Sequence, residues 1–446
     1  MSEVFIRDTT DSISNAVNEI LFNIEKRGSP IIKSSKKVYI KVNGIDFKKH
    51  TYTSPEVLDA VIMYLKEKGA EIFVMENSTQ GNLTRLVFEL TGYKKICEKH
   101  GAKIVYLDEE DSRTYEFKYK PSISEVSQGY ILKTYRMPET IVNIIDNRDT
   151  VTYINLPKLK THSMAVVTLG IKNQWGFPQH ADRGKDHNYN LHSKLVELYE
   201  VIKPDITIID GIEGTIHGHY PLTIWEDKLV IPFNVLIGGT DTLAVDVVGA
   251  RLFGLSIDEV PHLKIAYDHK LGEGDLNNIV VHGKDLGTYK KKYDWDILQK
   301  FPETVKIIKG KDLLCREGCQ NNPLIFLQVL AYDYPAKFNG GWFLIMGKGH
   351  DEDLIDQLKA GGYTIGLVAG FCAIEEVGQK LRKEFGRRKV YFSGNCNNLA
   401  DTVTAELKLS GMSALDLIPD LSSEKVMEFI QEAQKRGTSA LITTAF

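Results

Sequence analysis

Four of the five cysteines stand in the last third of the chain, at Cys315, Cys319, Cys372 and Cys396, and the fifth, Cys97, lies far upstream. Thiolates that converge from separate loops are ligands for a [4Fe–4S] cluster or for a tetrahedral zinc ion. The four cysteines are separated by 3, 52 and 23 residues, which matches neither a ferredoxin motif nor a pair of Cys-x2-Cys zinc motifs. We predict a four-cysteine cluster site, with zinc or unconnected thiols as the alternatives.

Short apolar segments precede these cysteines and are predicted to be β-strands. They are residues 304–310, 364–370 and 389–392, and the cysteines follow their carboxyl ends. In an open parallel sheet, ligands bind at the carboxyl ends of the strands. If the three strands are parallel, we therefore expect all four thiols at one edge of one sheet.

A second group of reactive side chains follows the apolar segment 151–156, in the run Pro-Lys-Leu-Lys-Thr-His at 157–162. Lysine and histidine side chains beside a threonine form a receptor for carboxylates or other anions. We assign general acid–base catalysis to Lys160, His162 and Lys172. A wider set is assigned to substrate binding: Lys41, Asn43, Lys158, Thr161, Asn173 and Asp210. The alternative is a solvated charged surface with one capping aspartate.

Lys41 is unusual because it stands in the otherwise apolar segment 36–43. A lysine inside a buried strand is costly unless it is paired or lies near the end of the strand. Glu76, at the end of the next predicted strand, is a candidate partner. The alternative for Lys41 is an edge-facing lysine.

Histidines offer a different metal site. His187 and His192 follow His162 in the sequence, and together they predict a zinc or nickel centre if the cysteines are only structural. His217 and His219 are a weaker pair, because two residues on one loop rarely define a site. Phosphate-binding Gly-x4-Gly-Lys-Ser/Thr, dinucleotide-binding Gly-x-Gly-x-x-Gly and hydrolase Gly-x-Ser-x-Gly motifs are missing where the strands would require them.

Alternating strand and helix patterns run through most of the chain and predict parallel sheets covered by helices. We expect an α/β protein with two Rossmann-like three-layer domains, at residues 1–300 and 301–446, and a cleft between them. A hinge is predicted near 285–303, where periodicity fades. Residues 109–149 are predicted to form an antiparallel insertion, and 439–446 a final strand.

Composition limits the functional class. The chain has 446 residues, 43% of them hydrophobic and 26% charged, with a net charge of −4, so we expect binding to neither nucleic acid nor a membrane. A basic and apolar leader is not visible at the N-terminus, and five cysteines do not suit a disulfide scaffold. We therefore expect a cytoplasmic protein.

Several of these motifs together resemble the domain-of-unknown-function 362 (DUF362) family over roughly residues 36–275. The matching stretches are Lys41-x-Asn43, Thr53–Val57, Glu76–Ser78, Pro157–His162, Leu169–Asn173, Asp210–Ile212 and Ala244–Asp246. The family pattern has Pro where this chain has Val42 and Gly-Asp where it has Glu76-Asn77. Many family members carry a Cys-x2-Cys-x2-Cys ferredoxin module, which this chain lacks, so the resemblance does not itself imply a cluster here. By fold analogy, the family is similar to nickel-dependent lactate racemase.

Three functions are compatible with these patterns. The first is an iron–sulfur enzyme, with an oxidoreductase role and a redox partner protein, that acts on a small anionic substrate under anaerobic conditions. The second is a nickel- or zinc-dependent racemase or lyase without a cluster. The third is a non-catalytic carrier of metal or clusters. Whether the chain forms a homodimer is left open by the sequence.

Overall fold

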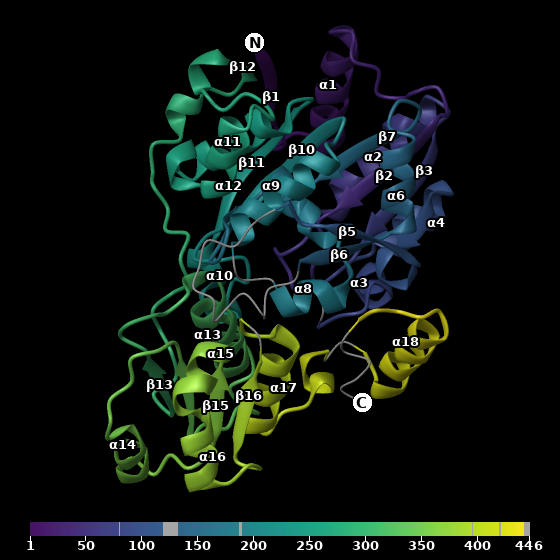
Figure 1. The fold of residues 1–446 in the computed structure, drawn as a ribbon. Helices are drawn as coiled ribbons and strands as arrows, with labels where there is room; N and C mark the ends of the chain where they lie inside the picture. Colours follow the sequence, from purple (N-terminus) through teal and green to yellow (C-terminus); the bar gives the residue numbers. More distant parts are fainter. Residues whose placement is uncertain (80, 119–132, 187–189, 395, 419–420, 441–446) are drawn as a thin grey trace.

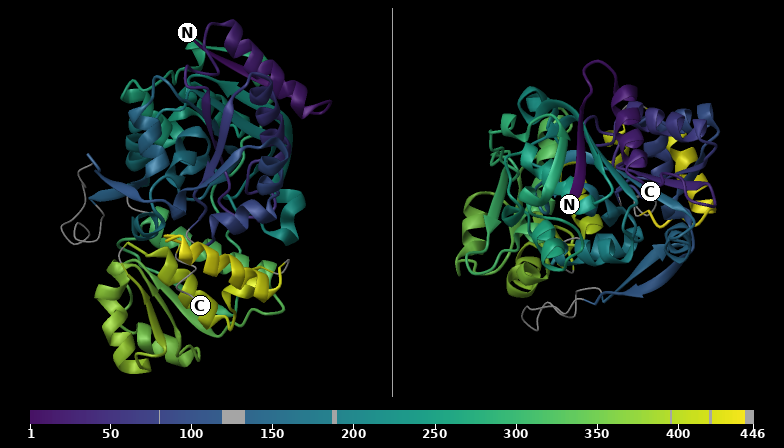
Figure 2. Two further views of the ribbon diagram at one scale, coloured as in Figure 1. Left: turned by 90° about the vertical axis from the view of Figure 1, so that its right-hand side faces the viewer. Right: turned by 90° about the horizontal axis from the view of Figure 1, so that it is seen from above.

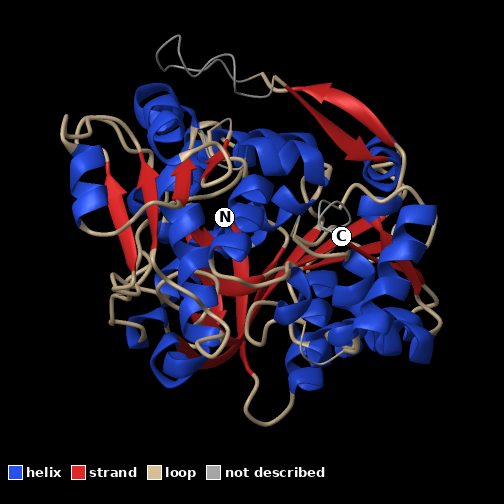
Figure 3. Cartoon of the chain, turned by 90° about the horizontal axis from the view of Figure 1, so that it is seen from below, coloured by secondary structure: helices blue, strands red, loops and turns tan. Residues whose placement is uncertain are grey.

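The computed structural model describes residues 1–79, 81–118, 133–186, 190–394, 396–418 and 421–440 (Figure 1). Most strands belong to two separate sheets, and helices lie on both sides of the strands (Figure 3). The predicted α/β class with mostly parallel sheets is confirmed. Where one domain ends and the next begins remains a prediction.

The first sheet has the strand order β12-β1-β11-β10-β7-β2-β3-β4, and β8 and β9 extend it beside β10. Neighbours from β10 through β7, β2 and β3 to β4 run parallel, whereas β11 is antiparallel to both β10 and β1. The strands of this sheet are β1 (Ser2–Asp8), β2 (Lys37–Val42), β3 (Glu71–Glu76), β4 (Lys103–Tyr106), β7 (Thr152–Leu156), β8 (Lys158–His162), β9 (Val166–Thr168), β10 (Ile206–Thr215), β11 (Val230–Gly239) and β12 (Ile279–Gly283).

Helices cover both faces of the first sheet. One face packs against α1 (Ile13–Lys26), α2 (Pro55–Glu67) and α4 (Tyr93–His100), where Cys97 is buried in the core. The other face packs against α6 (Glu139–Asp146), α9 (Leu191–Val201), α11 (Thr242–Leu252) and α12 (Pro261–Asp268). Shorter helices lie near the carboxyl ends of the strands: α3 (Thr84–Leu90), α7 (Gly170–Asn173), α8 (His180–Asp186) and α10 (Glu226–Leu229).

The second sheet consists of four parallel strands in sequence order: β13 (Val305–Lys309), β14 (Trp342–Met346), β15 (Gly366–Ala369) and β16 (Val390–Ser393). Its two faces are covered by α13 (Asn321–Gln328) and α17 (Leu399–Leu409) on one side, and by α14 (Leu354–Ala360), α15 (Phe371–Ala373) and α16 (Gln379–Phe385) on the other. All four strands therefore end at the same edge, as the cysteine argument requires.

The last described helix, α18 (Ser423–Lys435), returns to the first part of the chain. Its buried Val426, Ile430 and Ala433 pack with Leu83 and Leu86 at α3, and it lies beside that region in Figures 1 and 2. The predicted final strand at 439–446 falls mostly outside the described residues. The part of the chain after the second sheet thus helps to hold the two sheets together.

The predicted antiparallel insertion is confirmed as a pair of strands, β5 (Ser112–Glu116) and β6 (Thr134–Pro138), which projects from the side of the molecule (Figure 2). Across the part of the chain that the structure describes, the helices are too short or too polar to cross a membrane.

Glu406 generates a prediction about stability. It is fully buried in α17, and neither carboxylate oxygen has a hydrogen-bond partner among the residues that the structure describes. Burial raises the pKa of Glu406 well above its ordinary value, so the folded state loses stability as the pH rises through the pKa of the unfolded chain. We expect Glu406→Met to stabilise the protein by about 1–3 kcal/mol at pH 8, and by less near pH 4.

Thermal denaturation at the two pH values measures this effect. The exposed Glu352 provides the control, because Glu352→Met should leave the midpoint unchanged. A Glu406→Met variant that melts lower than the parent at pH 8 would contradict the prediction.

Candidate functional site

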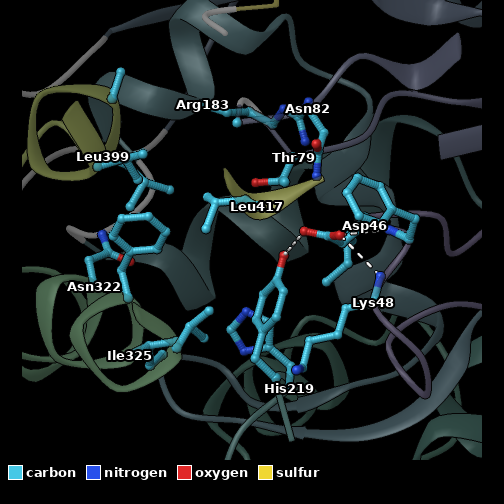
Figure 4. A pocket seen from close by; sticks show the side chains of 18 of the residues that line it. Asp46, Lys48, Thr79, Asn82, Arg183, His219, Asn322, Ile325, Leu399 and Leu417 are labelled. Atoms are coloured by element: carbon cyan, nitrogen blue, oxygen red, sulfur yellow. Dashed lines mark hydrogen bonds between the residues drawn. The ribbon is translucent and has the colours of Figure 1, made fainter. Parts of the chain in front are cut away.

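A cavity of about 780 Å³ lies where the carboxyl ends of the first sheet face α13, α17 and the segment after α17. In Figure 4, Ile325 and Leu399 lie across the cavity from Asp46 and Lys48, with Leu417 between them. The Nζ atom of Lys48 reaches over to the Asp333 carboxylate at 2.6 Å. The cavity is therefore built by residues that are far apart in the sequence.

Lys41 and Glu76 form a buried ion pair in the wall of this cavity. Both side chains are 1% exposed, and Glu76 also accepts hydrogen bonds from the amides of Gly44 at 2.5 Å and Asn77 at 2.8 Å. Burial lowers the pKa of Lys41, and Glu76 partly offsets that effect. The expected pairing of the two predicted strands is thus present, because β2 and β3 are adjacent and parallel.

Three asparagines connect neighbouring elements beneath the cavity. Asn43 Nδ2 donates to Asn173 Oδ1 at 2.8 Å, and Asn173 Nδ2 donates to Asn155 Oδ1 at 2.7 Å. Asn155 Nδ2 in turn donates to the Gly170 carbonyl at 2.9 Å. The network fixes the short helix α7, which carries Lys172, against β2 and β7.

Lys160 and Lys172 also line the cavity, and neither forms an ion pair with the described residues. Lys160 is fully buried and donates to the Thr51 carbonyl at 2.6 Å; burial and the nearby Lys172 charge lower its pKa well below the ordinary value. Burial, followed by the charges of Arg183 and Lys41, lowers the pKa of Lys172 to about 7. Lys172 can therefore exchange a proton near neutral pH.

Asp246 holds the helix that carries Lys172. Its carboxylate accepts the amides of Gly170 at 2.7 Å and Ile171 at 2.8 Å at the start of α7. Burial raises the pKa of Asp246 to about 7. We therefore regard Asp246 as a positioning residue for Lys172.

His162 lines the cavity and stacks on His219, with ring centroids 3.9 Å apart. Its Nδ1 accepts the amides of Met164 and Ala165, each at 3.2 Å. Because Nδ1 is the acceptor, the proton of the neutral ring must lie on Nε2. The ring is thus held in one tautomer.

Three of the predicted binding residues are near the cavity but do not line it. Lys158 forms a buried ion pair with Asp210 at 3.1 Å, and Asp210 also accepts the Ser54 amide at 2.6 Å. Thr161 exchanges hydrogen bonds with the backbone of Gly218 at 3.0 and 3.3 Å. These contacts support the loops of the site, so direct substrate binding by these three stays a prediction.

The cysteine loops meet around Cys319, which is buried in a π-helical turn, Arg316–Gln320, before α13. A Cβ atom added to Gly370 would lie 2.4 Å from Cys319 Sγ, so the sulfur packs directly on the turn after β15. Burial raises the pKa of the Cys319 thiol well above its ordinary value, and Cys315, Cys396 and Cys372 raise it further. The other three thiols therefore lie near enough to Cys319 to affect its charge, although β14 lies between β13 and β15.

Asparagine side chains attach the cysteine loops to their surroundings. Asn397, next to Cys396, donates to the Gly318 carbonyl at 3.1 Å. Asn321, two residues after Cys319, donates to the Ser163 carbonyl at 2.6 Å. Since Ser163 follows His162, the loop of Cys319 contacts the segment that carries the cavity residues Lys160 and His162.

The predicted metal ligands were the four cysteines and, as the alternative, the histidines. Among the described residues, no group of three His, Cys, Asp or Glu side chains lies in an arrangement that could hold a metal ion as placed. The four thiols suit an iron–sulfur cluster by chemistry and by their approach from three loops, but their sulfur atoms would have to close in around it. His192 instead stacks on His262, with ring centroids 5.4 Å apart, and His187 lies outside the described residues.

Several cavity residues were not predicted from the sequence. Arg183 is 6% exposed, and it donates to Asn77 Oδ1 at 2.8 Å and to the Ser78 carbonyl at 2.7 Å. Asp46 accepts a hydrogen bond from Tyr220 at 3.2 Å. Arg183 lies in the short polar helix α8 and Asp46 in the loop after β2, and the three-dimensional arrangement identifies them as cavity residues.

Lys172 generates the prediction for this site. We expect one dimethylated lysine to titrate near pH 7 by NMR of ¹³C-methylated protein, since burial disfavours the charged form. Lys172→Met should remove that transition, whereas Lys37→Met, at an exposed position, should retain it. A neutral transition that persists in Lys172→Met would contradict the assignment.

Known proteins resemble parts of this chain. Residues 38–251 match the model of a family described as domain of unknown function DUF362. A thylakoid-associated protein of Synechocystis sp. (strain ATCC 27184 / PCC 6803 / Kazusa) is 29% identical over 178 residues, which are 37% of this chain and about half (49%) of that protein. A crystal structure of a Thermotoga maritima protein aligns with a TM-score of 0.38 and 11% identity, over 89% of this chain and 82% of that one. The resemblance to the DUF362 family is therefore confirmed over residues 38–251, which include the Lys-x-Lys-Thr-His run and the cavity residues Lys41, Lys172 and Arg183.

Proposed function

We propose that this chain binds an iron–sulfur cluster through Cys315, Cys319, Cys372 and Cys396 and acts on a small anionic substrate in the adjacent cavity. The carrying observation is the meeting of three cysteine loops around Cys319, at the carboxyl edge of a parallel sheet. The chain has only five cysteines, and four of them gather in one place. Such a gathering is typical of residues that bind a metal or a cluster.

The cysteine loops also lie beside the cavity. Asn322 lines the cavity three residues after Cys319, and Leu399 lines it three residues after Cys396. A bound cluster would supply electron transfer, or Lewis acidity if one iron stayed open. A substrate in the cavity would therefore lie beside the first turns of α13 and α17, which follow directly after two of the cysteine loops.

The residues of the first sheet support the substrate half of the proposal. Protonated Lys172 and the Arg183 guanidinium would attract an anion, and Lys160 would hydrogen-bond to it. Lys172 and His162 would exchange protons with the bound substrate, because the lysine titrates near neutrality and the histidine ring is fixed. The oxidoreductase activity, a redox partner protein and a cytoplasmic location all belong to this proposal. A nickel or zinc enzyme or a metal carrier has no separate observation in its favour.

Anaerobic purification or reconstitution tests cluster binding. We expect about four iron and four sulfide per chain in the parent protein. Cys319→Ser should lose most of the iron, because the central thiolate of the set is removed. Cys97→Ser should keep the full content, since Cys97 is buried in α4 against α2 and the first sheet.

Circular dichroism and thermal denaturation of each variant would show that it is folded. A colourless, folded parent protein after reconstitution would contradict the proposal. A folded Cys319→Ser variant with full iron content would contradict the ligand assignment. Stoichiometric zinc or nickel in place of iron would favour a metal enzyme without a cluster.

Gly370 offers a second test that leaves every cysteine in place. Its φ of +84° disfavours other residues, and a Cβ there would collide with Cys319 Sγ. We expect Gly370→Ala to lower the iron content at least severalfold by displacing that sulfur. Gly362 has a similar φ of +77° with open space around it, so Gly362→Ala provides the same backbone strain without the collision.

Iron and sulfide analysis of both glycine variants measures the effect. Equal iron content in the two folded variants would show that close packing of Cys319 on the β15 turn is unimportant for the cluster.

A further inference from the structure

The cavity has two walls of opposite character. The residues from the first part of the chain are mostly polar or charged, and include Asn43, Glu76 and Asn173. The opposite wall comes from α13, α17 and the segment after α17, and most of its side chains are apolar. They are Ile325, Phe326, Val329, Leu399, Val403, Leu407, Met412, Leu415, Leu417 and Ile418.

The apolar wall keeps solvent-accessible surface in the described structure. Ile325, Phe326, Leu399, Val403 and Leu417 are all only partly buried, although the sheets on either side have well-packed cores. Contiguous exposed apolar surface inside a concave site is typical of ligand binding. Water would be displaced from this wall by an apolar group, with a favourable change in free energy.

The charged wall has the opposite sign to the rest of the protein. The described lining residues include seven lysines and arginines but three aspartates and glutamates, whereas the whole chain has a net charge of −4. Glu76 pairs with Lys41 and Asp333 with Lys48, so these pairs cancel two of the three acids and two of the seven cations. Burial raises the pKa of the third, Asp46, and so favours its neutral form. The field in the cavity therefore favours an anion.

We infer that the substrate of the proposed site is amphipathic, with an oxyanion head group bound by Lys160, Lys172 and Arg183 and an apolar body that covers the wall of α13 and α17. The reaction of this substrate rests on the proposed function, but its binding to the cavity does not. A cavity of about 780 Å³ is in the range that suits a small organic molecule rather than a free ion. Carboxylate and phosphate head groups share this chemistry.

Calorimetric titration with matched probes tests the inference. Octanoate and octyl phosphate carry both parts, acetate and inorganic phosphate carry the head alone, and octanol carries the chain alone. We expect each eight-carbon anion to bind at least tenfold more tightly than its head group or octanol, with about threefold to fourfold for each methylene that becomes buried. The tighter of the two anions identifies the preferred head group.

Variants separate the contributions of the two walls. Ile325→Ser should weaken octanoate severalfold and leave acetate unchanged, and the exposed Ile224, outside the cavity, provides the control Ile224→Ser. Lys172→Met should weaken the binding of both octanoate and acetate and leave the binding of octanol unchanged. Lys37→Met provides the control. Binding of octanoate should also weaken as the pH rises through 7, since Lys172 then loses its charge.

Iron content measured on the same samples distinguishes this inference from the proposed function. Equal affinity for acetate and octanoate in protein with a full cluster would overturn the amphipathic substrate and leave the cluster intact. Tight octanoate binding in protein that never acquires iron would support the inference and contradict the proposed function. Octanoate binding that is unchanged in Ile325→Ser would place the ligand elsewhere and also overturn the inference.

Discussion

Burial of several lysine ammonium groups under one cavity is the constraint on which the site depends. Lys41, Lys158, Lys160 and Lys172 are all at most 9% exposed, and removing a charged group from water is costly unless it is paired. Two of them have carboxylate partners: Lys41 pairs with Glu76, and Lys158 pairs with Asp210. Among the described residues Lys160 and Lys172 have none, and burial together with neighbouring cations lowers the pKa of both. An anionic ligand would supply the missing partner and would be held by the same electrostatics.

The second constraint is the direction of the strands. Parallel strands bring their carboxyl ends to one edge, so β13, β15 and β16 place loops from three parts of the chain around Cys319. The hydrogen bond from Asn321 to the Ser163 carbonyl then joins that edge to the histidine and lysines of the first sheet. The proposed cluster site and the cavity are therefore joined through α13 and α17, and the returning helix α18 packs on the first part of the chain.

Much of this arrangement could be predicted because it depends on local patterns. Apolar segments before Cys372 and Cys396 indicated strands, and an isolated lysine in an apolar strand indicated the Lys41–Glu76 pair. The apolar wall could not be predicted, because Ile325 and Leu417 have the same pattern as core residues and only their position beside a cavity distinguishes them. Likewise, Lys158 carries the same charge as Lys160 in the sequence, and only the approach of Asp210 from β10 shows that one is paired.

Anomalous diffraction at the iron edge, from crystals grown without oxygen, tests the central claim most directly. We predict a strong iron peak surrounded by the sulfur atoms of Cys315, Cys319, Cys372 and Cys396, beside the first turn of α13. Crystals that show ordered thiols at this edge without iron, or iron bound by other residues, would contradict the account.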